Sequence, residues 1–230
     1  ELIENQSRFI SFQIAENIRQ LIDLRTQILV ILAGPHRHLF PDGRDHFDEL
    51  AKSITGNLPG FVAINWIDPE GYIRWIYPDN SFNAPAKNQK VIDRPDLREF
   101  LNVAHKTKTP QLSNIVELYQ GGRGFTIYIP LFSKSGEFHG WLNAAIRYKD
   151  ILDRFFDRQR FENFYTKLSW VKYQNSIYEY GPGAKVEPEF VSTFKVMNQD
   201  FKVEASLRED SLLAKKRTGI HFIFIFSYFI

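Results

Sequence analysis

The chain contains no cysteine. Disulfide bonds, thiol catalysis and cysteine-ligated zinc are therefore excluded. It also lacks an excess of charge of one sign, because 29 Lys and Arg residues stand against 27 Asp and Glu residues. A nucleic-acid-binding domain usually carries a basic face, and no basic stripe is visible in this sequence. We therefore expect no nucleic-acid partner.

Motifs for catalysis, metals and cofactors are missing as well. No Ser-His-Asp arrangement with a GxSxG element is legible, and no carboxylate pair stands in a recognisable catalytic context. The histidines at 36, 38 and 46 lack the three or four ligands in defined geometry that a metal site needs. The glycines of residues 121–124 separate two expected strands, whereas a phosphate-binding loop joins a strand to a helix. We expect no catalytic residue, no metal and no cofactor in this chain.

A long apolar run is the third absence, because none reaches the roughly 20 residues that cross a bilayer. Residues 220–230 are apolar except for His221 and Ser227. Three interpretations stay open for this segment: the beginning of a transmembrane helix within residues 214–230, a buried terminal strand, or an artefact. The chain also begins at Glu1 rather than at a methionine, so we expect a processed or cut form.

What the chain does contain is enough apolar material for one large or two small domains, with 43% hydrophobic and 15% aromatic residues over 230 positions. The clearest pattern is an antiparallel meander within residues 110–147. We expect strands at 115–119, 125–132 and 138–147, because apolar and polar residues alternate in the middle one. The gaps between them contain glycine, which supplies the positive φ of tight turns.

The sequence before the meander, residues 1–109, predicts helices on either side of a hairpin. Residues 1–33 carry apolar residues at helical spacing and are followed by Gly34 and Pro35, which should end the helix. Such a helix, about 50 Å long, is either a coiled-coil stalk or a spine along a two-module body, and we expect a homodimer through it. Beyond it we expect a helix at 44–54, strands at 60–67 and 72–77 around a Pro-Gly turn, and a helix at 96–106.

After the meander, a connecting helix at 148–162 leads to expected strands at 168–173, 176–180, 190–197 and 199–206, with an exit helix beginning within 207–213. The fold class is therefore α+β: a long N-terminal stalk helix, a PAS-like antiparallel sheet domain, and a smaller second PAS-like β unit. We assign residues 1–35 to the stalk, 36–150 to the PAS-like module, and 151–213 to the smaller second module.

Candidate ligand-binding residues are polar side chains within otherwise apolar strands, together with two arginines near the helix at 96–106. A binding pocket typically places a few polar groups in an apolar lining. The alternative is that one face of an antiparallel sheet is exposed to water and carries these residues, and that the arginines only cap and solvate the helix. The candidates are Asn65, Arg74, Tyr77, Arg94, Arg98, Thr126, Tyr128 and Asn143.

Three stretches resemble a known family. They are IDPEGYIRWIYP at 67–78, the run from DRPDLREF to TIYIPLF at 93–132, and GEFHGWLNAAIRYKDILD at 136–153. Together they resemble the CHASE domain, a ligand-binding sensor domain of membrane receptors, chiefly bacterial histidine kinases and diguanylate cyclases and plant cytokinin receptors. The most specific part is the QGGRGF strand-turn-strand, followed by Pro130 and Gly140.

The resemblance implies a periplasmic or extracellular domain on the outer side of the plasma membrane, anchored through flanking segments before Glu1 and from Ile220. It implies that the module at 36–150 is membrane-distal and binds an unknown small-molecule ligand, and that the module at 151–213 is membrane-proximal. It also implies a kinase or cyclase outside this chain. Two alternatives stay open: a cytosolic PAS-like regulatory module of an unidentified enzyme, and an enzyme of unrecognised class. Polar flanking sequences on both sides would favour the cytosolic alternative.

Overall fold

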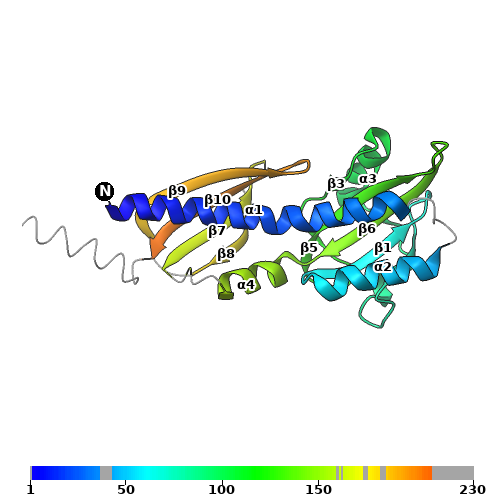
Figure 1. The fold of residues 1–230 in the computed structure, drawn as a ribbon, viewed down its shortest axis with the longest axis horizontal. Helices are drawn as coiled ribbons and strands as arrows, with labels where there is room; N and C mark the ends of the chain where they lie inside the picture. The colour runs from blue at the N-terminus through cyan, green and yellow to red at the C-terminus, as the bar shows by residue number, and fades with distance from the viewer. Residues whose placement is uncertain are drawn as a thin grey trace, which may run out of the picture. The chain divides into compact units, whose positions relative to one another are not determined.

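The structure is a computed structural model that describes residues 2–36, 43–158, 161, 163–172, 176–181 and 185–208 (Figure 1). The chain divides into two compact units, each with its own antiparallel sheet. The larger comprises Leu21–Ile151 with Met197–Gln199, and the smaller comprises the remaining residues. Among the described residues, no helix is long and apolar enough to cross a membrane, and the segment 214–230 lies outside them.

Helix α1 (Leu2–His36) is amphipathic, as the sequence predicts. The side chains that it buries recur every three to four residues and include Ile14, Ile18, Ile22 and Leu29. Its residues to Gln20 belong to the smaller unit, and those from Leu21 onward belong to the larger. The helix continues through Gly34 and Pro35 to His36. The breaker pair therefore lies in its last turn rather than beyond its end.

The sheet of the larger unit has the order β2-β1-β6-β5-β3, and β4 also pairs with β5. Its strands are β1 (Phe61–Ile67), β2 (Ile73–Tyr77), β3 (Gln111–Leu112), β4 (Val116–Glu117), β5 (Arg123–Phe132) and β6 (Phe138–Ile146). The turn between β1 and β2 forms as expected, since the N–H of Gly71 donates to the Asp68 carbonyl at 2.9 Å. The strand expected at 115–119 is shorter, because a turn begins at Leu118, whose carbonyl accepts from the N–H of Gly121.

Helices cover both faces of this sheet. On one face, Phe47 of α2 (Arg44–Asn57) contacts Trp75, with 5.6 Å between ring centroids. On the other, Leu101 of α3 (Pro95–Thr107) shares a core with Trp141, whose Nε1 donates to the Leu101 carbonyl at 3.2 Å. The interpretation that one face is exposed to water is therefore wrong. Polar side chains on the α3 face are buried within the unit.

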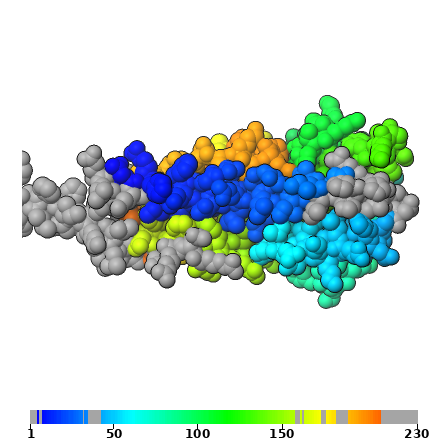
Figure 2. Space-filling model, in the orientation of Figure 1, coloured from blue at the N-terminus to red at the C-terminus, as the bar shows by residue number. Residues whose placement is uncertain are grey.

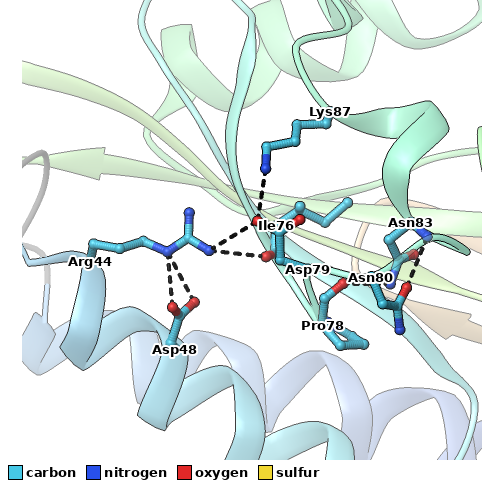
Figure 3. Close-up of polar contacts among 8 residues, drawn as sticks. All are labelled: Arg44, Asp48, Ile76, Pro78, Asp79, Asn80, Asn83 and Lys87. Carbon is cyan, nitrogen blue, oxygen red and sulfur yellow. Dashed lines mark hydrogen bonds and ion pairs between the residues drawn. The ribbon is translucent and has the colours of Figure 1, made fainter.

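The segment between β2 and α3, which we call the roof segment (residues 78–94), contains the short helices η2 (Ala84–Ala86) and η3 (Val91–Asp93). Polar contacts fix its beginning (Figure 3). Asp79 accepts from Lys87 Nζ at 2.8 Å and lies 3.8 Å from Arg44 of α2, which also pairs with Asp48. Asn83 Nδ2 donates to the Pro78 carbonyl at 2.9 Å. The roof segment is thus tied to itself and to α2.

The smaller unit contains most of α4 (Tyr148–Arg158) and a sheet of order β8-β7-β10-β9. Its strands are β7 (Phe164–Trp170), β8 (Ser176–Tyr180), β9 (Lys185–Val196) and β10 (Gln199–Arg208). Two expectations are wrong at the boundaries. The strand expected at 168–173 begins four residues earlier and ends at Trp170, and Leu207 continues β10 instead of beginning an exit helix. Residues 209–213 lie outside the described part.

Candidate ligand-binding site

A cavity lies on the α3 face of the larger sheet, below the roof segment. Strands β1, β5 and β6 supply its floor, and residues 86–97 and 116–120 supply its walls. About 20 Å³ is available to the centre of a water-sized sphere, which is room for one or two waters. The lining residues are Asn65, Ile73, Ala86, Val91, Arg94, Leu97, Val116, Leu118, Tyr119, Gln120, Thr126, Tyr128, Asn143 and Ala145.

Strand register places the polar floor residues in one row. Asn65 of β1 is the partner of Asn143 of β6, and Asn143 is the partner of Tyr128 of β5. Directly opposed residues in antiparallel strands point to the same face, and Thr126 follows two positions away on that face. Their exposed fractions are 2% for Asn65, 4% for Asn143, 1% for Tyr128 and 6% for Thr126. The sequence-predicted candidates in these strands therefore come together below the roof segment.

The two asparagines form a directed chain of hydrogen bonds. Asn143 Nδ2 donates to the Ile127 carbonyl at 3.0 Å, and Asn65 Nδ2 donates to Asn143 Oδ1 at 2.7 Å. Among the described residues, the remaining amide oxygen, Asn65 Oδ1, is buried and has no hydrogen-bond partner. The Thr126 hydroxyl is also buried without a partner in hydrogen-bond geometry, and it lies beside the Tyr128 phenol, whose pKa burial raises and this hydroxyl, to a smaller extent, lowers. Burying such groups unpaired costs free energy, and both atoms belong to residues that line the cavity.

Arg94 contributes the positive charge of the wall. It precedes α3, and its guanidinium donates to Asp96 through Nε and Nη2 and to the Glu117 carbonyl through Nη1. The guanidinium also lies over the ring of Tyr119, 5.0 Å from its centroid. The hydrogen bond from Arg94 lowers the pKa of Asp96 below its usual value. Arg94 is therefore compensated by a carboxylate beside the cavity.

Tyr128 is the fully buried phenol of the floor. Burial raises the pKa of its hydroxyl well above the usual value of 10. The phenol is therefore neutral at physiological pH and can both donate and accept a hydrogen bond. A neutral hydroxyl of this kind suits recognition of a polar ligand group.

Three sequence-predicted candidates lie outside this lining. Arg74 pairs with Asp68 through Nε. Tyr77 is the register partner of Ile64, which places it on the α2 side of the sheet. Arg98 donates to the Ile92 carbonyl at 2.8 Å and so ties α3 to η3. The two arginines thus support the β1–β2 turn and the roof segment.

Several lining residues are absent from the sequence-based selection, notably Tyr119, Gln120 and Val91. A signal for the first two exists in the adjacent glycines. A Cβ atom on Gly124 would lie 2.3 Å from the Ile146 carbonyl oxygen and 2.7 Å from Leu118 Cδ1. Only glycine permits this close approach, which brings residues 116–120 onto the sheet. Val91 lies in the roof segment, which has no periodic pattern that would reveal its position.

The groups at this site fit binding better than turnover. They are amides, hydroxyls, phenols and an arginine already paired with a carboxylate, and they line a small and mostly apolar space. Within the described ranges, no group of three or more histidine, aspartate or glutamate side chains is placed to hold a metal ion. The arrangement can fix a small molecule by hydrogen bonds while excluding water.

Comparison with known families and folds agrees with the α+β assignment. The family model of the CHASE domain matches residues 66–177, a region that contains most of the cavity lining. No curated protein sequence matches the chain.

Solved structures share the fold at low identity. An extracellular ligand-binding receptor from Desulfohalobium retbaense DSM5692 matches with TM-score 0.70 and 12% identity. The match covers 87% of this chain and 40% of the receptor chain. The extracellular domain of rpHK1S-Z16, described as a histidine kinase, matches with TM-score 0.65 and 16% identity, covering 91% and 96% of the two chains. The ligand-binding domain of the amino acid chemoreceptor PctC of Pseudomonas aeruginosa PAO1, in complex with GABA, matches with TM-score 0.61 and 13% identity, covering 89% and 99%.

Proposed function

We propose that the chain, in which the CHASE family model matches residues 66–177, is the extracytoplasmic sensor domain of a membrane-bound signalling receptor. It binds a small molecule in the cavity below α3. The observation that carries the proposal is the row of buried polar side chains, Asn65, Asn143 and Tyr128, in a sheet whose neighbouring positions are apolar. Two atoms of this floor lack partners, and a ligand would supply them.

The structural relatives support a small organic ligand. The PctC domain was solved with GABA, and the structural match covers 89% of this chain and 99% of the PctC chain. A ligand of similar size needs more space than the roughly 20 Å³ that the cavity offers. Binding therefore requires the roof segment or α3 to shift away from the sheet. The ligand-bound state then has a larger cavity than the roughly 20 Å³ of this structure.

This movement of the roof segment or α3 transmits the signal. A ligand changes an equilibrium between two states only if it binds them with different affinity, and a cavity that is closed in one state and open in the other provides that difference. The receptor output is a histidine kinase or a diguanylate cyclase encoded beyond this chain. Flanking membrane segments hold the domain on the outer side of the plasma membrane.

We further propose that α1 pairs with α1 of a second copy. Besides its buried stripe, the helix carries large apolar side chains that are between 50% and 66% exposed: Phe9, Phe12, Leu24 and Ile31. At 100° per residue, Phe9, Leu24 and Ile31 lie on the side opposite Ile18 and Ile22, with Phe12 at the edge of that side. The atoms of α1 lie at the surface in Figure 2. A second apolar stripe on a long helix is typical of helix–helix association.

Sedimentation of the isolated chain tests the homodimer. Leu24→Glu with Ile31→Glu places charge within the exposed stripe and should shift the chain to a monomer at concentrations where the wild type is dimeric. The matched control is Val191→Glu, which charges an exposed apolar residue of β9 that is 57% exposed. A wild type that stays monomeric at high concentration, or equal behaviour of the two variants, would contradict pairing through α1.

Thermal-shift screening with amino acids, carboxylates, amides and purines tests the sensor function, because a ligand that binds the native state raises its stability. Ala145 lies in the cavity lining and is 4% exposed, so Ala145→Leu fills the cavity from its floor. Compounds that raise the melting temperature of the wild type should have no effect on this variant. Compounds that stabilise both proteins equally would place binding elsewhere and reject the proposed site.

A further inference from the structure

The hydrogen-bond chain on the cavity floor has a direction that the backbone dictates. A main-chain carbonyl only accepts hydrogen bonds, so the Ile127 carbonyl requires Asn143 to present Nδ2 to it, at 3.0 Å. Asn143 Oδ1 then faces Asn65, which must present its own Nδ2, at 2.7 Å. The orientation of both amides follows from this one carbonyl. Reversing either amide alone would place two donors or two acceptors against each other.

The consequence is that Asn65 presents the acceptor Oδ1 at the cavity, while one N–H of its Nδ2 is used toward Asn143. Its Oδ1 is buried without a partner, and the Thr126 hydroxyl, on the same face, is also unpartnered. Both residues are more than nine-tenths buried and line the cavity. A group that satisfies Asn65 Oδ1 must donate an N–H or O–H, and a group beside it can accept from the hydroxyl of Thr126 or Tyr128.

Charge further restricts the buried end of the ligand. Among the described residues that line the cavity, none is acidic, so a buried ammonium group would have no carboxylate against it. A carboxylate at this point would face the Asn65 oxygen. The arginine of the wall already has Asp96 as its partner, within hydrogen-bond distance. Burying an unpaired charge is costly, so both ionic classes are disfavoured at the floor.

From these observations we infer that the ligand is uncharged at its buried end and presents an amide-like edge. Its N–H donates to Asn65 Oδ1, and its adjacent carbonyl oxygen accepts from Thr126 or Tyr128. Carboxamides, lactams and ureides belong to this class. The inference rests on the proposed ligand-binding function of the same cavity. The free space of about 20 Å³ admits a single small group at this point, so the rest of the ligand enters as the roof segment shifts.

Matched probes test the charge and polarity of the ligand. The wild-type chain is titrated with propionamide, propionate and propylamine, and with benzamide, benzoate and benzylamine, while its melting temperature is recorded. The same titrations are made with Asn65→Leu/Asn143→Leu, which removes both amides together, and with Ala145→Leu, which fills the cavity. Circular dichroism shows whether each variant is folded.

The expected result is that the amides raise the melting temperature of the wild type more than the acids or amines do. Loss of one ligand hydrogen bond corresponds to about tenfold weaker binding, so the double-leucine variant should bind the amides at least that much more weakly. Stabilisation by acids or amines that Ala145→Leu abolishes would overturn the inference and leave the sensor function standing. An equal rise in melting temperature in the wild type and the double-leucine variant would mean that the amides bind away from the floor and would overturn the inference. No response to the amides in either protein would also overturn it.

Discussion

The two sheets of the molecule share one strand order. The larger runs β2-β1-β6-β5 before its short edge strands, and the smaller runs β8-β7-β10-β9. Each sheet joins two hairpins. In the larger sheet β1 of the first hairpin pairs with β6 of the second, and in the smaller sheet β7 pairs with β10 in the same way. They differ in the connection between the hairpins. Residues 78–110 separate β2 from β3 and include α3, whereas residues 181–184 separate β8 from β9.

This difference shows where a binding site can arise on such a sheet. Both sheets bury hydroxyls that lack partners, Thr126 in the larger and Thr166, Ser169 and Ser206 in the smaller. In the larger unit, the long connection covers the sheet and leaves a cavity lined by Thr126. In the smaller unit, Thr166 shares a sheet face with Phe164 and Leu168 within the core. We therefore expect polar floor residues to affect ligand binding only below the roof segment.

The largest expected effect concerns the contact between sheet and α3. Trp141 is 2% exposed, packs against Phe138 and donates to the Leu101 carbonyl. Trp141→Ala should lower the free energy of unfolding by about 3–5 kcal/mol, because it opens a large cavity between sheet and helix. Urea denaturation followed by circular dichroism measures this loss. Val171→Ala, at an exposed position of the smaller unit, should change stability by less than about 0.5 kcal/mol.

A smaller loss of stability is expected when one of the two floor amides is removed without the other. Asn65→Leu or Asn143→Leu alone leaves the other amide buried without its partner and should cost about 1–3 kcal/mol of unfolding free energy. The double variant replaces both polar groups by apolar ones and should cost clearly less than the sum of the single changes. Denaturant titration of all four proteins completes the cycle. Strictly additive losses would show that the amides do not act as a pair.

A matched pair of threonine substitutions compares the two sheets directly. Thr126→Val and Thr166→Val each remove an unpartnered buried hydroxyl while keeping the shape of the side chain. Each should therefore raise the free energy of unfolding by about 1 kcal/mol. Only Thr126→Val should weaken binding of a compound that the wild type binds. Equal loss of binding in both variants would show that the hydroxyl below the roof segment has no special role.

The smallest effect is a dependence on pH through Asp96. Arg94 lowers the pKa of this carboxyl in the folded state, so its contribution is complete above the unfolded value near 3.8 and is lost as the pH falls through the folded value. The Asp96 side chain is 46% exposed, which limits the effect to below about 1 kcal/mol. Arg94→Gln should reduce the acid-induced loss of stability measured by denaturant titration between about pH 6 and about pH 2. A steeper loss in the variant would contradict this assignment.

The sequence predicts the parts of this structure that follow a local pattern. Strand β5 alternates apolar and polar residues, and Gly71, Gly121 and Gly136 take the positive φ that the expected turns need. The polar residues Asn65 and Asn143 stand out in apolar strands for the same reason. Their grouping with Thr126 and Tyr128 could be proposed from the strand pattern alone.

The rest depends on contacts between distant segments. Whether the face with Asn65 is wet or buried is decided by the roof segment, which has neither helical nor strand periodicity. Arg94 and Arg98 are only four residues apart, yet the first lines the cavity and the second binds the Ile92 carbonyl. That distinction follows from Arg94 standing before the first turn of α3. No local pattern indicates it.

The most direct test of a ligand site on the α3 face is a nuclear magnetic resonance titration of the side-chain amides. The wild-type chain, labelled with nitrogen-15, is titrated with the matched amide that stabilises it most, and the resonances of Asn65 and Asn143 are assigned from their leucine variants. Both resonances should shift along the binding curve, while the side-chain amide of the exposed Asn57 in α2 stays in place. Saturable binding that leaves the Asn65 and Asn143 resonances unchanged would contradict a ligand site on this face.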